Sequence, residues 1–175
     1  MALALIFEIL TVLIIGLVIY LTAKLIVSAY LTDGERKRSD ARKAAYDQAL
    51  LPLKLQAGER MILLLERMTP PQAVYRTMQP GMTVLELQMS LVRHIREEFE
   101  HNVAQQIYLS PACWTIIRTA KEEVIRMVNM AASEADVGAN AGELGRLLLE
   151  HWGQLHENPV QSAIDRVKAE IRETG

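Results

Sequence analysis

Residues 93–108 read RHIREEFEHNVAQQIY, and the spacing of their apolar side chains decides the fold of the surrounding chain. Apolar residues recur every three or four positions, which is the period of one face of an α-helix. At 100° per residue, Val92, Ile95 and Val103 lie within about 40° of Phe99. The stretch therefore predicts an amphipathic helix whose inward face is centred on Phe99.

The opposite face of this helix carries charged side chains. His94, Glu97 and His101 lie about 140–160° from Phe99, and Glu98 lies about 100° away. The spacing of His94, Glu98 and His101 would allow three metal ligands on one side. However, the second Glu-x-x-His motif of di-iron bundles and the zinc-protease motif are both missing. No metal and no cofactor are therefore predicted.

Two other interpretations of the charged face stay open. Arg93–Glu97 and Arg96–Glu100 have the i,i+4 spacing of ion pairs worth about 0.2–0.5 kcal/mol each, which favours a solvated surface. The alternative is a face that contacts a partner protein. Its candidate contact residues are His94, Glu97, Glu98 and His101.

Two amides on the apolar side need hydrogen-bond partners. Asn102 and Gln106 lie about 60° and 20° from Phe99, so both are expected to face inward. A buried amide costs free energy unless it is hydrogen-bonded. We expect these side chains to bond to a loop or a neighbouring helix and to fix its register; a bound ligand is the weaker alternative.

The chain on both sides of this helix has the same period. Thr83 and Glu86 have the spacing of a capping box, which is typical of a helix start, so the central helix is expected over 83–109. The other helix boundaries are marked by three short motifs, Thr69-Pro70-Pro71, Ser110-Pro111 and Asn158-Pro159. The further helices are expected over 52–68, 70–78, 111–133, 144–155 and 159–171, with a loop over 134–142.

Each expected helix has an apolar stripe, and no stretch alternates as a strand would. The stripes comprise Leu53, Ala57, Met61, Leu64 and Met68, then Leu87, Leu91, Ile95, Phe99, Val103 and Ile107, widened by Val92, then Ile117, Ala120, Val124, Val128 and Ala131, then Leu144, Leu147, Leu148, Trp152 and Leu155, and last Val160, Ala163, Ile164, Val167 and Ile171.

Residues 61–65 are apolar on every side of their helix. Such a helix either lies in the centre of its bundle or offers a second face to a partner. Central burial is favoured. In the alternative, the contact residues are Met61, Ile62 and Leu63.

The N-terminal stretch ALALIFEILTVLIIGLVIYLTA, residues 2–23, contains one charged residue, Glu8. A helix of this length rises roughly 33 Å, enough to cross the hydrocarbon core of a bilayer. No Lys or Arg precedes Lys24, so the basic start of a cleaved signal peptide is missing. We therefore predict an all-α protein with a transmembrane anchor (2–31), a helical juxtamembrane stalk (32–50) and a compact cytoplasmic bundle of four to five helices (51–175).

The charges around the span predict its orientation. Lys and Arg concentrate on the cytoplasmic side of single spans, which places the N-terminus outside and the C-terminal domain in the cytoplasm. The basic cluster after the span is expected to contact anionic lipid headgroups. It comprises Arg36, Lys37, Arg38, Arg42 and Lys43.

The overall charge and the cysteine content narrow the environment further. A net charge of −2 without a basic stripe in the soluble part makes nucleic acid an unsuitable partner. The one cysteine, Cys113, fits a reducing compartment. No oriented base can be assigned to its thiol, so the sequence does not support an enzyme.

Glu8 and Lys24 lie sixteen residues apart, about 24 Å along a helix. This is less than the roughly 30 Å hydrocarbon core, so both can lie near opposite edges of the bilayer. The alternative is that Glu8 meets a basic or proton-carrying group on a partner span. The span has no Gly-x-x-x-Gly motif and the stalk has no heptad pattern, which leaves homo-oligomerisation open.

Three segments, LPLKLQAGERMILLLERMTP, QPGMTVLELQ and IREEFEHNVAQQIYLS, resemble an uncharacterised family of small membrane proteins from Bacteroidota. The resemblance covers about residues 50–170. Gly58 departs from it, because a bulkier residue such as Tyr is expected there. The resemblance implies a single inner-membrane span with a helical cytoplasmic domain, and it implies no activity.

Together these features predict a non-enzymatic adaptor or scaffold at the cytoplasmic face of a bacterial inner membrane, with membrane lipid and one or more proteins as partners. The alternative is an accessory subunit of a membrane transport or proton-driven machine that uses the span and Glu8.

Overall fold

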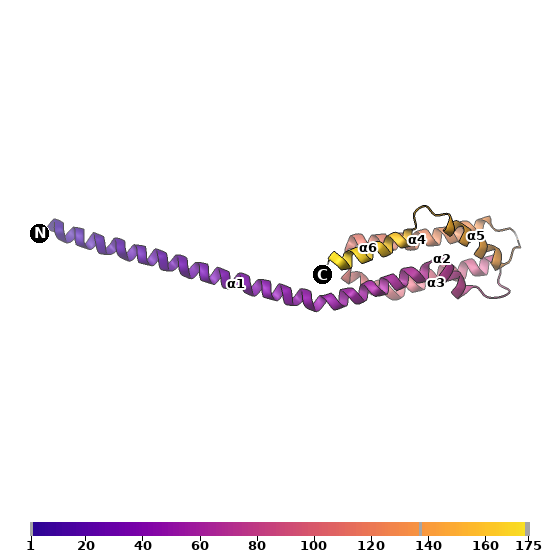
Figure 1. The fold of residues 1–175 in the computed structure, drawn as a ribbon, viewed down its shortest axis with the longest axis horizontal. Helices are drawn as coiled ribbons and strands as arrows, with labels where there is room; N and C mark the ends of the chain where they lie inside the picture. The colour runs from indigo at the N-terminus through magenta and orange to yellow at the C-terminus, as the bar shows by residue number, and fades with distance from the viewer. Residues whose placement is uncertain (1, 137, 174–175) are drawn as a thin grey trace. The chain divides into compact units, whose positions relative to one another are not determined.

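A computed structural model describes residues 2–136 and 138–173, apart from the side chains of residues 2–5, 12 and 29–36. These residues form helices and no strand (Figure 1); one isolated β-bridge joins Thr83 and Asn140. The all-α prediction is confirmed. The elements are α1 (Ala2–Met68), α2 (Pro70–Thr77), α3 (Val84–Asn102), the 3₁₀-helix η1 (Val103–Tyr108), α4 (Pro111–Glu134), α5 (Ala141–Gly153) and α6 (Pro159–Glu173).

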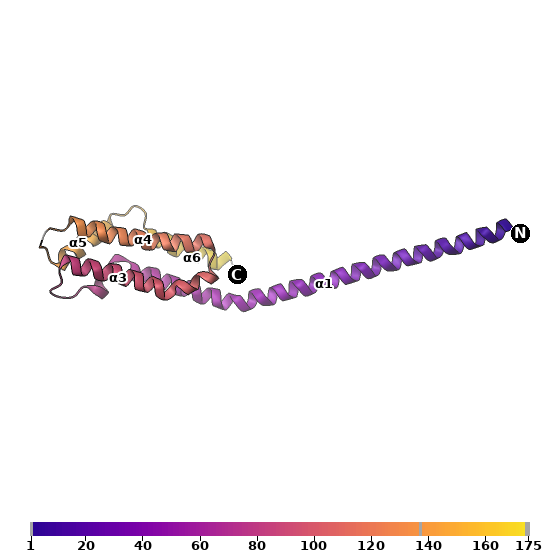
Figure 2. The same cartoon turned by 180° about the vertical axis from the view of Figure 1, so that it is seen from behind.

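The chain divides into two compact units, Met1–Ala49 and Leu50–Gly175. The first is helical and contains an apolar stretch, Ile6–Ser28, that is long enough to cross a membrane. The second contains the end of α1 and all later elements, and Figure 2 shows α3, α4 and α6 lying side by side in it. Five longer helical segments therefore form this bundle, with α2 and η1 as short additions.

Helix α1 is longer than the sequence suggested. A new helix was expected to begin near Pro52, but Pro52 lies inside α1. A proline in a helix interior removes one backbone hydrogen bond and crowds the preceding turn. Burial in the bundle begins at Ala57, just over one turn beyond this proline.

The core of the second unit consists of apolar side chains from every long segment, and among the described residues no polar side chain is buried. The predicted stripe is confirmed throughout α4, in α3 as far as Ile95, and in α6 except Ile171, which is partly buried. In the α5 stripe, Leu144 and Leu148 are buried, whereas Leu147, Trp152 and Leu155 are only partly buried. The stripe at the end of α1 is confirmed except at Leu53, which is exposed. Fully or nearly fully buried side chains include Ala57, Met61, Leu64, Leu65, Met68, Leu87, Leu91, Ile95, Ile117, Ala120, Val124, Val128, Ala131, Leu144, Leu148, Val160, Ala163, Ile164 and Val167.

The apolar run at 61–65 lies mostly inside the bundle. Met61, Leu64 and Leu65 are buried, and Ile62 is partly buried against the core. Leu63 alone points outward, with 56% of its surface exposed. Central burial is confirmed for this segment, and Met61 is wrong as a contact residue because the bundle encloses it.

The central helix ends earlier than predicted. Helix α3 stops at Asn102, and η1 follows it, where a continuous helix to Leu109 was expected. A 3₁₀-helix has 3.0 residues per turn, so the apolar stripe loses its register there. As a result Gln106 is exposed, and so are Val103 (41%) and Ile107 (73%).

The prediction for the two amides is also wrong. Asn102 is only half-buried, and its Nδ2 donates to the Glu98 carbonyl oxygen one turn earlier, at 2.9 Å. Gln106 is exposed on η1. Neither side chain fixes the register of a neighbouring helix.

The helix starts follow the capping pattern. Thr83 Oγ1 accepts from the Glu86 backbone N–H, and Glu86 Oε2 accepts from the Thr83 backbone N–H at 2.8 Å, so the predicted capping box is confirmed. The Thr83 backbone N–H and the Thr83 hydroxyl both donate to the Glu86 carboxylate and lower its pKa. Asn158 Oδ1 likewise accepts from two backbone N–H groups at the start of α6.

The start of α4 is also held by a residue from α6. The Glu170 carboxylate accepts the Ser110 backbone N–H at 2.6 Å and the Ser110 hydroxyl, and Ser110 Oγ accepts from the Cys113 backbone N–H at 3.2 Å. Arg166 lies 3.6 Å from the same carboxylate. Ser110 was expected to cap α4, but the sixty-residue link to Glu170 was not predicted.

Cys113 is fully buried beside this cap. Desolvation, and then the nearby Glu170 charge, raise the pKa of its thiol from about 9 to about 11. The folded protein therefore holds the thiol proton more tightly than the unfolded chain does. This contribution to stability is complete below pH 9 and is lost as the pH rises toward 11.

We predict that the free energy of unfolding falls more steeply between pH 9 and 11 in the native protein than in Cys113→Ala. The measurement is denaturant unfolding of the two full-length proteins in detergent across this range. Because both carry the same Lys and Tyr residues, the difference isolates the thiol. Parallel pH profiles would contradict the raised pKa.

Gly58 is buried at a close contact between α1 and α6. A Cβ atom at this position would lie 2.9 Å from Cδ1 and Cγ1 of Ile171. The packing of Ile171 explains why this chain has glycine where its family resemblance suggested a larger residue.

Candidate interaction surface

Helix α3 contacts α1 on one side and α4 on the other. On the α1 side, Glu98 Oε2 lies 3.2 Å from Arg67 Nη1. On the α4 side, the Phe99 ring centroid lies 5.1 Å from that of Trp114, and Lys121 Nζ lies 4.5 Å above the Phe99 ring. The remaining side of α3 faces away from the core. We call this side the outer face of α3; its residues are Leu85, Met89, Arg93, Arg96, Glu97 and Glu100.

The outer face combines exposed apolar side chains with two hollows. Leu85 is 62% exposed and Met89 is 64% exposed. One hollow runs from Leu85 to Glu100 and extends to Asn129 of α4, which accepts a hydrogen bond from Gln88 at 3.0 Å. The other lies between α3 and the turn at residues 79–82. Met89 and Arg93 line both hollows and form the ridge between them.

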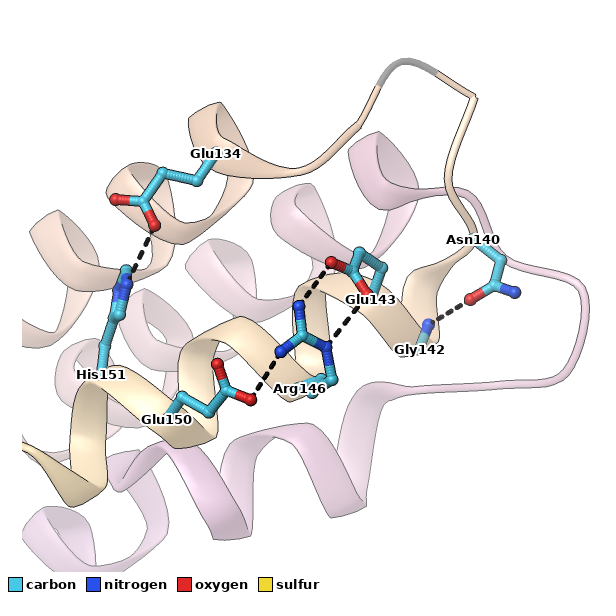
Figure 3. Close-up of polar contacts among 7 residues, drawn as sticks. All are labelled: Glu134, Asn140, Gly142, Glu143, Arg146, Glu150 and His151. Carbon is cyan, nitrogen blue, oxygen red and sulfur yellow. Dashed lines mark hydrogen bonds and ion pairs between the residues drawn. The ribbon is translucent and has the colours of Figure 1, made fainter.

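The charges of the outer face do not pair with one another as predicted. Within the described part of the chain, neither Arg93–Glu97 nor Arg96–Glu100 comes within ion-pair distance. The prediction of i,i+4 pairs on this helix is therefore wrong. Pairs of this kind form elsewhere: Arg146 bridges Glu143 and Glu150 on α5 (Figure 3).

The three side chains whose spacing would allow a metal site, His94, Glu98 and His101, do not form a cluster among the described residues. Glu98 is paired with Arg67, and His101 is exposed, with its Nδ1 donating to the Glu97 carbonyl oxygen at 2.7 Å. His94 is half-buried, and its Nε2 is shielded without a hydrogen-bond partner among the described atoms. No group of three possible ligands occurs in residues 2–136 and 138–173. His94 was expected to be solvated, and this was wrong.

The other candidate contact residues border the outer face. Leu63 and Arg67 are one turn apart on α1, so they share a side of that helix. Arg67 reaches Glu98 on α3, which places Leu63 near the junction of the two helices. We call Leu63, Arg67 and Glu98 the α1–α3 edge. Glu97 and His101 are exposed beside it.

A second histidine ties α5 to α4. His151 Nε2 lies 3.0 Å from Glu134 Oε2, and Asn140 caps α5 by accepting from the Gly142 backbone N–H at 2.9 Å (Figure 3). These contacts hold the two ends of the loop that contains Val137, which lies outside the described residues. They are structural links between helices.

The residues predicted to meet the membrane lie in the first unit. Glu8 is the third residue of the apolar stretch Ile6–Ser28, and Lys24 is the fifth from its end, so both lie toward the ends of this stretch. In the basic cluster the exposed residues are Lys37, Arg38, Arg42 and Lys43. The Arg36 side chain lies outside the described residues. The lipid contacts remain predictions.

The outer face of α3 was not predicted from the sequence, where the candidate contacts were His94, Glu97, Glu98 and His101. Leu85 and Met89 carry the signal that could have found it. Both are large apolar residues on the polar side of an amphipathic helix, one turn apart and close to Arg93. Met and Arg, which this face has at Met89, Arg93 and Arg96, are enriched in protein interfaces.

Comparisons with known proteins place the chain in a family. Neither the curated proteins nor the solved structures include a match. A family model matches residues 4–174, so the similarity extends beyond the expected 50–170 and includes the apolar N-terminal segment. The chain therefore belongs to a family of unknown function (DUF7935).

Proposed function

We propose that the protein is a membrane-tethered, non-enzymatic adaptor that holds partner proteins at the cytoplasmic face of a bacterial inner membrane. One observation carries the proposal: an apolar span in the first unit is joined to a bundle that exposes apolar and charged side chains outside a complete core. Tethering and surface contact are the two properties an adaptor needs.

The α1–α3 edge is the proposed docking surface for a partner protein. The Leu63 side chain is exposed although Met61 and Leu64, close to it on the same helix, are buried. Beside it, Arg67 and Glu98 form a partly exposed ion pair, and Glu97 and His101 add polar groups. An exposed leucine with a charged rim has the anatomy of an interface, apolar at the centre and polar around it.

Site-specific photo-crosslinking in native membranes tests this surface. A photoreactive amino acid is placed at Leu63, Arg67 or His101 of the full-length chain, three positions outside the outer face of α3. The control position is Leu149, a leucine on α5 with similar exposure. We expect the first three positions to crosslink the same protein, identified by mass spectrometry, and Leu149 not to crosslink it. Identical crosslinks from all four positions would contradict a docking surface at the α1–α3 edge.

The substitution Leu63→Glu gives a second readout. A charge at the centre of an apolar contact costs several kcal/mol of binding, on the order of a 10²-fold loss of affinity for 2.7 kcal/mol. We expect the crosslinked partner to be lost in Leu63→Glu and retained in Leu149→Glu. Retention in both variants would exclude Leu63 as a contact.

The alternative is an accessory subunit that works through the span and Glu8, and it predicts a different result when the span is replaced. If the span is replaced by an unrelated anchor, an adaptor keeps its partner because the bundle carries the contact. An accessory subunit loses its partner, and Glu8→Gln alone should weaken that association. Loss of the crosslinks on span replacement would therefore favour the alternative.

A further inference from the structure

The outer face of α3 carries two arginines followed by two glutamates, and the arginines form no ion pairs with the glutamates of the same helix in the described part of the chain. Arg93 and Arg96 precede Glu97 and Glu100, and in the described part of the chain none of these four side chains forms an ion pair. We propose that a second copy of this chain packs against this face, with its α3 antiparallel to the first. The proposal adds self-association to the adaptor role, and its face adjoins the α1–α3 edge, with Glu97 at the border of the two surfaces.

The order of the charges selects the antiparallel arrangement. A two-fold axis that crosses α3 between Arg96 and Glu97 brings Arg96 opposite Glu97 of the second copy and Arg93 opposite Glu100. Each pair occurs twice, as required of an isologous contact. A parallel pairing in register would instead place like charges opposite each other, which is unfavourable.

The exposed apolar residues fall into the same register. With a rise of about 1.5 Å per residue in α3 and about 2.0 Å in η1, Leu85 and Ile107 lie about 17 and 18 Å from the axis. Met89 and Val103 lie about 11 and 10 Å from it by the same measure. The antiparallel pairing therefore places Leu85 near Ile107 and Met89 near Val103 of the second copy, so apolar contacts flank the central charges.

The contact is small, because it is formed mainly by one helix of each copy. Exposed ion pairs contribute little, about 0.2–1 kcal/mol each. Two chains anchored in one bilayer, however, meet at a much higher effective concentration than two free domains. The proposal thus relies on the membrane tether for concentration only, and it is tested with the full chain in membranes.

The test uses charge reversal with two epitope tags. Variant A carries Arg93→Glu and Arg96→Glu, and variant B carries Glu97→Arg and Glu100→Arg. Each is co-expressed with a differently tagged copy of itself or of the other variant, and the second tag is quantified after purification on the first. We expect the native pair to co-purify, A with A and B with B to fall at least tenfold, and A with B to recover to near the native level.

Recovery in the A–B mixture distinguishes self-association from misfolding and from another occupant. A variant that fails to fold, or one that loses a different protein, gains nothing from the oppositely charged copy. The matched control, Arg118→Glu with Lys168→Glu, reverses two exposed charges on α4 and α6 and should co-purify with itself as the native chain does.

Three results would overturn the proposal. They are a native chain that does not co-purify with itself, A–A and B–B pairs that associate as well as the native pair, and an A–B pair that stays dissociated. The amount of chain in the membrane fraction is measured in the same cells, so a failed tether is told apart from a failed contact between copies. Crosslinking from Leu63 reports the adaptor role separately.

Discussion

Replacing Leu65 by alanine is expected to lower the free energy of unfolding by about 2–5 kcal/mol, whereas Leu63→Ala is expected to change it by no more than about 0.5 kcal/mol. Leu65 has no exposed surface, and Leu63 is more than half exposed. The first substitution leaves a cavity among packed side chains, and the second removes atoms that already contact solvent. Both make the same change of helix propensity, so their difference reports burial alone.

Denaturant unfolding of the full-length protein in detergent measures this difference. Trp114 packs against Phe99 in the bundle, so its fluorescence follows the loss of the core. Equal effects of the two substitutions would show that the end of α1 does not pack into the bundle. A large effect of Leu63→Ala alone would mean that a second copy or another surface covers Leu63.

The buried stripes could be predicted from sequence because they depend on one repeated property. In α4, each of Ile117, Ala120, Val124, Val128 and Ala131 is buried as expected. Their period of three to four residues matches one side of a helix, and the helix begins at a Ser-Pro step. Packing against any apolar neighbour satisfies such a stripe, so its burial does not require knowledge of the partner helix.

The end of α3 could not be predicted in the same way. The apolar pattern continues through Val103 and Ile107, but the backbone changes to a 3₁₀-helix after Asn102. This change follows from the tertiary structure, since Leu109 must be buried and α4 must begin at Pro111. A pattern that assumes 3.6 residues per turn therefore assigns Gln106 and Val103 to the wrong side.

The candidate contacts were predicted only in part. Glu97, His101 and Leu63 are exposed, as a contact surface requires, whereas Met61 is enclosed and His94 is half-buried. The error at His94 comes from treating a helix as an isolated cylinder. His94 lies one turn before Glu98, on the side of α3 that carries the ion pair with Arg67 of α1, and its partial burial shows only in the packed bundle.

Links between residues distant in sequence had no local signal, and Glu170 is the clearest case. It looks like one of several polar residues on the last helix, yet its carboxylate joins the start of α4, sixty positions away. Ser110 had been recognised as the cap of α4 from the Ser-Pro step. The backbone N–H of Ser110 also needs a hydrogen-bond acceptor. This need was the only indication that a residue from elsewhere in the chain contributes to the cap.

We expect Glu170→Ala to lower the free energy of unfolding by about 1–3 kcal/mol, because the partly buried Ser110 N–H and hydroxyl lose their acceptor. The loss includes the favourable position of a carboxylate at the N-terminus of a helix. Glu170→Gln should cost less, since its carbonyl oxygen can still accept from the Ser110 N–H. Denaturant unfolding followed by tryptophan fluorescence measures both effects.

The matched control is Glu173→Ala, on the same helix and near the same Arg166. Its side chain is mostly exposed, so its removal should change the free energy of unfolding by no more than about 0.5 kcal/mol. In Ser110→Ala the hydroxyl contact is already absent, so a further Glu170→Ala should cost less there than in the native protein. Strict additivity of the two substitutions would show that Glu170 and Ser110 act independently, and the cap would then not depend on α6.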